Sequence, residues 1–290
     1  FSWKIDGQPY EHVITLPEIP EISLSKLQIS FSPLPSKTQV SFDYIRMTAI
    51  PLPTPTPTPI PIFGKAASLN IKSENNQYIE IIQSARDIHP MSLQTIEAWV
   101  YLTNIHKSPY STQIINASTL ENGLVWVLQI TNDRKLSYSG LLHSDGGGIS
   151  RNYCSFKGKT VIQENKWYHI AIVKQIITVG EIEMFVDGKT DGKMDCIEAS
   201  PRSLPLVGIG GPPYQGWSVP VYFEGFIDEV RFSNGTRYRS SNVTPPNRPF
   251  VNDKYTTGLW HLDGNALDSS DYKKNGKIVG NIQFIDSTIL

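Results

Sequence analysis

The sequence is poor in cysteine, almost without net charge, and free of long apolar runs. Two cysteines in 290 residues are too few for a disulfide scaffold, and they lack the CxxC spacing of a zinc site. With 26 basic and 27 acidic side chains, the chain offers no electrostatic basis for binding nucleic acid or an anionic membrane. No apolar run approaches the roughly 18 residues that a membrane-spanning helix needs, so we expect no membrane insertion.

Strong helix formers do not dominate the composition either. Thr, Ser, Asn, Tyr, Ile and Val are plentiful, while Ala, Leu, Glu and Lys are not dominant, and this balance favours strands. The two cysteines, Cys154 and Cys196, fit either one disulfide in an oxidising compartment or two unpaired thiols.

Residues 51–62, PLPTPTPTPIPI, place proline at every second position. Proline fixes φ and keeps the preceding residue extended, so this segment favours polyproline II and would make a semi-rigid spacer of roughly 37 Å. The alternative is a proline-rich edge that lies along its own domain. A spacer predicts a module on each side, in residues 1–50 and 63–290.

After this segment, apolar and polar residues alternate with the period of two that is typical of strands. The segment TIEAWVYL carries on one face Ile96, Ala98, Val100 and Leu102, and on the other Glu97, Trp99 and Tyr101. LVWVLQI, KWYHIAIVK, EIEMFVDGK and FIDEVRF continue the series. Asp187-Gly188 predicts a hairpin, because a type I′ turn needs positive φ at both central positions. The pattern predicts an all-β, antiparallel two-sheet sandwich.

Five segments resemble, in order, the strands of laminin-G-like domains of the concanavalin A-like lectin/glucanase superfamily. They are ASLNIKSENNQYIEI, TIEAWVYLT, NKWYHIAIV, MFVDGKTDG and EGFIDEVRFSNGTRYRSSNVTPP. The resemblance runs from about Phe63 to Pro249 and implies a jelly roll of two packed antiparallel sheets.

Both ends of the chain repeat parts of this pattern. In residues 1–50, SFDYIRM parallels FIDEVRF, which predicts a small partial β-sandwich module. Residues 257–290 contain GLWHLDGNALDSSDYKKNGKIVG, which resembles the segment before the first strand in many family members. They form either extra strands on the same sandwich or the start of a further repeat. Open strand edges at either end would permit self-assembly with a neighbouring chain.

The sequence does not predict an enzyme. The superfamily includes glucanases, whose retaining mechanism needs two carboxyl groups about 5–5.5 Å apart. In those enzymes the pair lies on one strand in an ExDxE or ExDxxE pattern, which is absent here. Glu181 and Glu183 are two residues apart, but they precede an ordinary hairpin and have no aspartate between them.

The resemblance implies a structural calcium ion. Many sandwiches of the superfamily hold calcium near the aspartate of the closing strand and an early turn. The matching residues here are Asp228 and, in the turn SENNQY, Glu74, Asn75 and Asn76. These side chains carry the hard oxygen ligands that calcium prefers. Alternatively, Asp228 caps a strand or pairs with Arg231 or Arg237.

Carbohydrate binding would depend on aromatic side chains, because sugar rings stack their C–H faces on Trp and Tyr. The candidates are Trp126, Tyr138, Tyr214 and Trp217, with polar contacts from His143 and Arg151. The loop GPPYQGWSV holds two of these aromatics, which either plug the end of the sandwich or face a ligand.

These features predict an extracellular or cell-surface protein that recognises glycan or a surface partner without catalysis. A rival interpretation is a structural subunit of a surface layer, filament or phage-like assembly. A third is an accessory part of a larger glycan-degrading enzyme.

Overall fold

The computed structural model describes residues 2–5, 8–11, 64–69, 77–82, 95–103, 111–119, 123–143, 149–175, 180–196, 205–213, 222–239 and 243–287. The chain divides into two compact units, Phe1–Thr56 and Pro57–Leu290. In the first unit, β1 (Ser2–Ile5) and β2 (Gln8–Glu11) pair as an antiparallel hairpin. The remainder of the predicted 1–50 module and the 51–62 linker lie outside the described residues. Within those residues, no helix is long and apolar enough to cross a bilayer.

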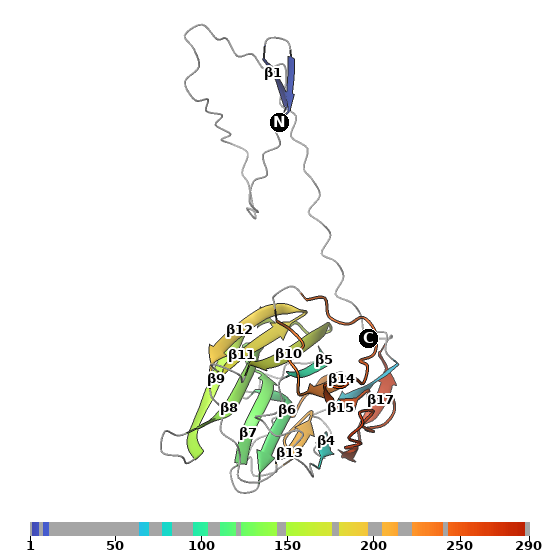
Figure 1. Cartoon of the computed structure of the whole chain (residues 1–290). Helices are drawn as coiled ribbons and strands as arrows, with labels where there is room; N and C mark the ends of the chain where they lie inside the picture. The colour runs from blue at the N-terminus through green and yellow to red at the C-terminus, as the bar shows by residue number, and fades with distance from the viewer. Residues whose placement is uncertain are drawn as a thin grey trace. The chain divides into compact units, whose positions relative to one another are not determined.

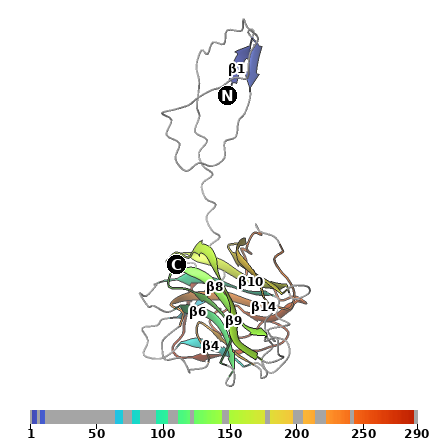
Figure 2. The same cartoon turned by 90° about the vertical axis from the view of Figure 1, so that its left-hand side faces the viewer.

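The second unit is a sandwich of two antiparallel sheets (Figures 1 and 2). The order of the first sheet is β12-β11-β10-β5-β14-β3-β17, with β15 also paired to β14. Its strands are β3 (Lys65–Leu69), β5 (Thr95–Leu102), β10 (Trp167–Gln175), β11 (Glu181–Val186), β12 (Lys189–Asp195), β14 (Gly225–Ser233), β15 (Thr256–Trp260) and β17 (Gln283–Asp286).

The order of the second sheet is β16-β4-β13-β6-β7-β8-β9. Its strands are β4 (Tyr78–Ile81), β6 (Thr112–Thr119), β7 (Gly123–Ile130), β8 (Lys135–His143), β9 (Ile149–Val161), β13 (Leu206–Ile209) and β16 (Gly276–Val279). The predicted all-β two-sheet sandwich is therefore confirmed.

Strand β5 follows the alternation that its sequence predicts. The inner residues of β5 belong to the large core between the two sheets: Ile96, Ala98, Val100 and Leu102. Trp99 and Tyr101 point to the opposite face, where they join a separate apolar cluster with Trp167, Phe226 and Phe250. Every residue of β5 is buried, which shows that the outer face of this sheet is also covered.

The chain that follows β14 provides part of this cover. Tyr238 packs on the outer face with Phe185 and Ala171, and Phe250 packs near Trp99. The described part of the segment between β14 and β15, residues 234–239 and 243–255, thus contributes side chains to this face, and we call it the covering segment. It also forms the pocket described below.

The hairpin predicted at Asp187-Gly188 is present. Asp187 has φ 50° and Gly188 has φ 74°, and the register pairs Val186 with Lys189 across a two-residue turn. Positive φ at both central positions is the signature of the type I′ turn that matches strand twist.

A disulfide and an aspartate join the edge strands of the two sheets on one side of the sandwich. Cys154 on β9 bonds to Cys196, directly after β12, with the two Cα atoms 6.1 Å apart. Asp191 on β12 accepts backbone hydrogen bonds from Lys159 (3.1 Å) and Thr160 (2.7 Å) on β9. Of the two alternatives left open by the sequence, the structure adopts the disulfide.

The C-terminal residues form strands on the same sandwich. β15 pairs with β14, β17 pairs with β3, and β16 pairs with β4 of the other sheet. This segment therefore supplies edge strands to both sheets rather than standing apart as the start of a repeat. Self-assembly through the terminal strands stays a prediction.

Candidate functional site

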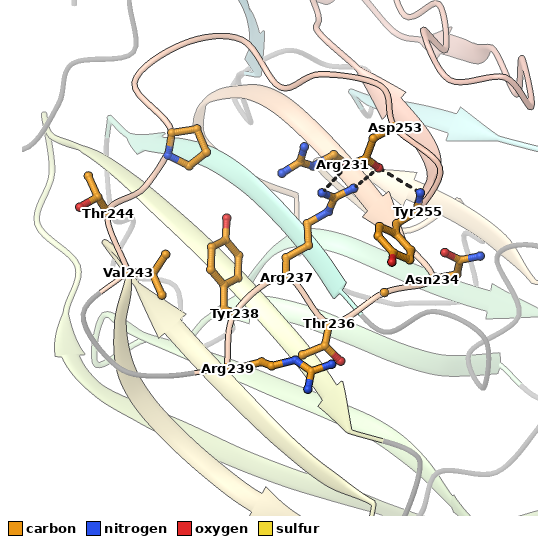
Figure 3. A pocket seen from close by; sticks show the side chains of 12 residues that line it. Arg231, Asn234, Thr236, Arg237, Tyr238, Arg239, Val243, Thr244, Asp253 and Tyr255 are labelled. Atoms are coloured by element: carbon orange, nitrogen blue, oxygen red, sulfur yellow. Dashed lines mark hydrogen bonds and ion pairs between the residues drawn. The ribbon is translucent and has the colours of Figure 1, made fainter.

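A pocket of about 590 Å³ opens beside the end of β14, under the covering segment (Figure 3). We call it the arginine pocket. It is lined by Arg231, Asn234, Gly235, Thr236, Arg237, Tyr238, Arg239, Val243, Thr244, Pro246, Asp253 and Tyr255.

A β-bulge in β14 positions the first of these arginines. Asp228 lies opposite Trp99 and Arg231 lies opposite Glu97, so β14 holds one more residue than β5 over this stretch. The extra residue coincides with Glu229, whose φ is 51°. Because one inserted residue changes which side chains face outward, the bulge aims Arg231 at the outer face beside Glu97.

Glu97 is fully buried and lies at the centre of a polar network beneath the pocket. Arg231 donates to its Oε1 at 2.7 and 2.8 Å. Tyr238 donates its hydroxyl to Oε2 at 2.5 Å, and Nε2 of His169 lies 3.2 Å from the same oxygen. Nε of Arg237 lies 3.5 Å from Oε1. We refer to these five residues as the Glu97 network.

The network keeps Glu97 ionised although no water reaches it. Burial raises the pKa of a carboxyl group, but here the hydrogen bond from His169 and the charge of Arg231 outweigh burial and lower the pKa of Glu97 to about 2. Burial and the negative charge of Glu97 raise the pKa of Tyr238 above its usual value, so its hydroxyl remains a donor. At this point of the outer sheet face, the ion pair of Glu97 and Arg231 is buried beside the apolar clusters.

Hydrogen bonds to residues other than Glu97 hold the side chain of Arg237 in place. Its two terminal nitrogens donate to the two oxygens of Asp253 at 3.0 and 2.9 Å, the bidentate geometry that a guanidinium favours (Figure 3). Nε donates to Ser233 at 2.5 Å, and one terminal nitrogen also donates to Thr256 at 3.0 Å. The hydrogen bond from Arg237 is the main reason why the pKa of Asp253 lies well below its usual range.

Four further lining residues are exposed to solvent: Asn234, Arg239, Thr244 and Tyr255. Tyr255 is 46% exposed, and Lys254 lies with its ammonium 4.8 Å from the centre of the Tyr255 ring. The pocket thus combines two immobilised arginines, one exposed aromatic ring and exposed polar groups, a composition that suits a polar ligand.

Two of the aromatic residues predicted to contact a ligand lie in the core instead. Trp126 and Tyr138 are fully buried between the sheets. The ammonium of Lys174, itself 2% exposed, lies 5.7 Å from the Trp126 ring and 5.1 Å from the Tyr138 ring. The prediction that they bind a ligand was wrong, because their rings instead surround a buried cation.

The other four candidates are not brought together by the described structure. His143 is the last residue of β8, and its backbone pairs with Ile149 of β9, the strand that carries Arg151. The side chains of His143 and Arg151 are not described. Tyr214 and Trp217 lie outside the described residues, so their role stays a prediction.

Asp228 is fully buried on β14. Its Oδ1 accepts a hydrogen bond from the backbone of Glu229 at 2.9 Å, while Oδ2 has no partner among the described residues. Burial, with the charge of Glu229, raises the pKa of Asp228 to about 9. The alternative pairing with Arg231 or Arg237 was wrong, because those arginines pair with Glu97 and Asp253.

Of the four residues expected to bind calcium, the structure describes only Asp228. The described residues contain no group of three or more candidate ligands, whereas calcium takes six to eight oxygens. Glu74, Asn75 and Asn76 lie outside them. The last described residue before this turn, Leu69, pairs with Gly225, three residues before Asp228. That register places Leu69 roughly 10 Å along the strand from Asp228.

Calcium binding at Asp228 therefore stays a prediction with a direct test. If it is correct, adding calcium at 100 times its Kd to chelator-treated protein should raise the Tm by roughly 5 °C. Asp228→Asn should abolish this rise, because the unpaired Oδ2 becomes part of a neutral amide. An unchanged Tm in the wild-type protein would remove Asp228 from any metal site.

Sequence reasoning missed the pocket residues Arg231, Arg237, Asp253 and Tyr255 as a group. The segment FIDEVRFSNGTRYRSS contains Arg231 and Arg237, but their spacing of six residues does not by itself indicate a binding site. The signal that could have pointed to them is Glu97, a charged residue in the middle of an otherwise apolar strand segment. A buried carboxylate requires a cationic partner, and β14 is the strand next to β5.

Comparison with known proteins agrees with the fold. A candidate carbohydrate-binding protein from Bacteroides ovatus is 18% identical, with a TM-score of 0.55 over 77% of this chain and 60% of that one. This chain thus spans less than two thirds of that relative. The CBM40 of the Ruminococcus gnavus IT-sialidase is 16% identical, with a TM-score of 0.43 over 59% of this chain and 91% of that one. Domains LG4-5 of the mouse laminin alpha1 chain are 13% identical, with a TM-score of 0.40 over 62% and 45%.

The likeness to the Bacteroides protein, at 18% identity, shows the fold alone. No curated protein matches the chain. Residues 73–241 match the Laminin_G_3 family, described as the concanavalin A-like lectin/glucanases superfamily. Since this match spans more than half of the 290 residues, the chain belongs to the Laminin_G_3 family.

Proposed function

We propose that the protein is a non-catalytic glycan-binding module that acts outside the cell, and that the arginine pocket is its ligand site. The observation that carries this proposal is the pocket itself, in which fixed arginines and an exposed tyrosine line an open space of about 590 Å³. Membership of a lectin-like family and the Bacteroides relative, described as a candidate carbohydrate-binding protein, add support.

The lining groups suit a sugar. The exposed ring of Tyr255 offers a face for the C–H groups of a pyranose, and Asn234 and Thr244 offer hydrogen bonds to hydroxyl groups. Arg237 is already oriented by Asp253 before any ligand arrives. Because its side chain need not be ordered on binding, less conformational entropy is lost than with a mobile arginine.

The carboxylates of this region are engaged in structure, which favours binding over hydrolysis. Among the described residues, Asp253 is the one carboxylate that lines the pocket, and Arg237 donates to both of its oxygens. Glu97 behind it is inaccessible and ionised, so it cannot donate a proton. On β11, Glu181 pairs with Lys193 at 3.0 Å and Glu183 accepts a hydrogen bond from Thr190 at 2.6 Å.

The disulfide supports the extracellular location in this proposal. The bond between Cys154 and Cys196 persists in an oxidising compartment and is rare in a reducing cytosol. A glycan-binding module outside the cell would meet its ligand directly.

Tyr255→Ala tests the proposed site. We expect it to weaken binding to the glycans selected by an array screen about tenfold, because the stacking face is lost. Isothermal titration calorimetry measures the change. Tyr272→Ala is the matched control, since Tyr272 is similarly exposed at 43% but does not line the pocket. Absence of binding to every glycan, or equal loss in both variants, would contradict the proposal.

A further inference from the structure

The charge around the arginine pocket is not balanced. In the part of the chain that the structure describes, three arginines line it, against the single carboxylate of Asp253. Asp253 is paired with Arg237, and the buried Glu97 is paired with Arg231. The third arginine, Arg239, takes part in neither of these ion pairs.

Arg239 is exposed on the covering segment and makes no hydrogen bond or ion pair with another described residue. Figure 3 shows its side chain at the edge of the pocket beside Thr236. Its planar guanidinium carries five N–H donors that can meet two oxygens of one anion at once. It is therefore the lining cation whose donors are available to a ligand.

A second cation strengthens the positive field at the same site. Lys254 is exposed next to Asp253, and its ammonium lies over the ring of Tyr255. It too makes no ion pair with another described residue. Lys254 does not line the pocket, but its ammonium would lie near a sugar that contacts Tyr255.

We propose that the glycan bound in the arginine pocket is acidic, and that Arg239 binds its carboxylate or sulfate group. This inference rests on the proposed function of the same pocket. Arg231 and Arg237 do not make the primary contact, since Glu97 and Asp253 occupy their donors. They fix the pocket wall, and Arg239 and Lys254 supply the uncompensated charge that attracts the anion.

The test compares acidic sugars with their neutral derivatives on the intact chain. One arm titrates oligogalacturonate and its methyl ester, and the other titrates chondroitin sulfate oligosaccharides and their chemically desulfated form. We expect one acidic ligand to bind at least tenfold more tightly than its neutralised derivative. We also expect the acidic ligand to lose affinity as salt is raised, because exposed charges are screened.

The variant Arg239→Gln assigns the contact. It should weaken binding of the acidic ligand about tenfold and leave binding of the neutral derivative unchanged. Arg248→Gln is the control, because Arg248 is an exposed arginine of the same covering segment that does not line the pocket. It should leave both affinities unchanged.

The outcomes separate the two proposals. If neutral and acidic glycans bind equally and Tyr255→Ala weakens both, the pocket binds glycan, but the inference that this glycan is acidic is wrong. If an acidic ligand binds better but Arg239→Gln has no effect, Arg239 is not the contact and the inference fails. If no glycan binds, acidic or neutral, the proposed function fails together with it.

Discussion

Replacing Glu97 with glutamine is expected to lower the free energy of unfolding by about 3–5 kcal/mol. The substitution preserves the shape of the side chain but removes the charge that compensates Arg231, which is only 7% exposed. Arg231 would then be a buried cation with a neutral partner, and such a cation retains the full cost of desolvation. Urea denaturation followed by tryptophan fluorescence measures the loss.

Glu181→Gln is the matched control for this experiment. Glu181 also pairs with a cation, Lys193, but its side chain is 28% exposed and that of Lys193 is 63% exposed. Water already screens such a pair, so we expect a change below about 1 kcal/mol. A similarly small change in Glu97→Gln would show that the Glu97 network contributes little to stability.

The same carboxylate also predicts how acid affects stability. The folded-state pKa of Glu97, about 2, lies below its unfolded value near 4.5, so folding favours the ionised form. Its contribution is therefore fully present above about pH 4.5 and is lost as pH falls toward 2. The wild-type protein should lose stability over this range more steeply than Glu97→Gln does. If the free energy of unfolding falls equally steeply with decreasing pH in the two proteins, the low pKa of Glu97 is contradicted.

Removing the disulfide should have an effect of similar size. Cys154 and Cys196 are 42 residues apart in sequence, and closing a loop of this length lowers the entropy of the unfolded chain by the equivalent of about 4 kcal/mol. The double variant Cys154→Ser/Cys196→Ser should lose about this much free energy of unfolding. The backbone hydrogen bonds from β9 to Asp191 should keep the two edge strands together at low denaturant.

Reduction of the wild-type protein provides the internal control. Treatment with dithiothreitol should shift its urea midpoint toward that of the double variant, and it should leave the double variant unchanged. The effect of reduction is compared through the free energy of unfolding at zero urea. If reduction lowers this free energy in the wild-type protein by less than about 1 kcal/mol, the disulfide restrains the unfolded chain less than its loop length predicts.

The sandwich could be predicted from the sequence because the alternation of residue types within a single strand identifies its inward and outward faces. In β5 each inward residue is aliphatic and each outward residue is polar or aromatic, so the alternation is readable without any tertiary information. The Asp187-Gly188 hairpin was predictable for a similar reason, since few other residue pairs adopt positive φ twice in succession.

The binding region could not be predicted in this way, because its geometry depends on register. The bulge at Glu229 decides that Arg231 lies opposite Glu97, and no local pattern marks one inserted residue. Trp126 shows the same limit. In LVWVLQI nearly every residue is apolar, so the sequence does not say which face looks inward, and the structure places this ring in the core.

The most direct test of the central claim is to map glycan binding by NMR on the isotope-labelled chain. Backbone amide chemical shifts would be recorded while the glycan selected by the array is titrated to saturation. We predict that the largest shifts fall in residues 234–239 and 253–255, around the arginine pocket. If the shifts instead cluster in the loop that carries Tyr214 and Trp217, the ligand binds elsewhere and the arginine pocket is not the site.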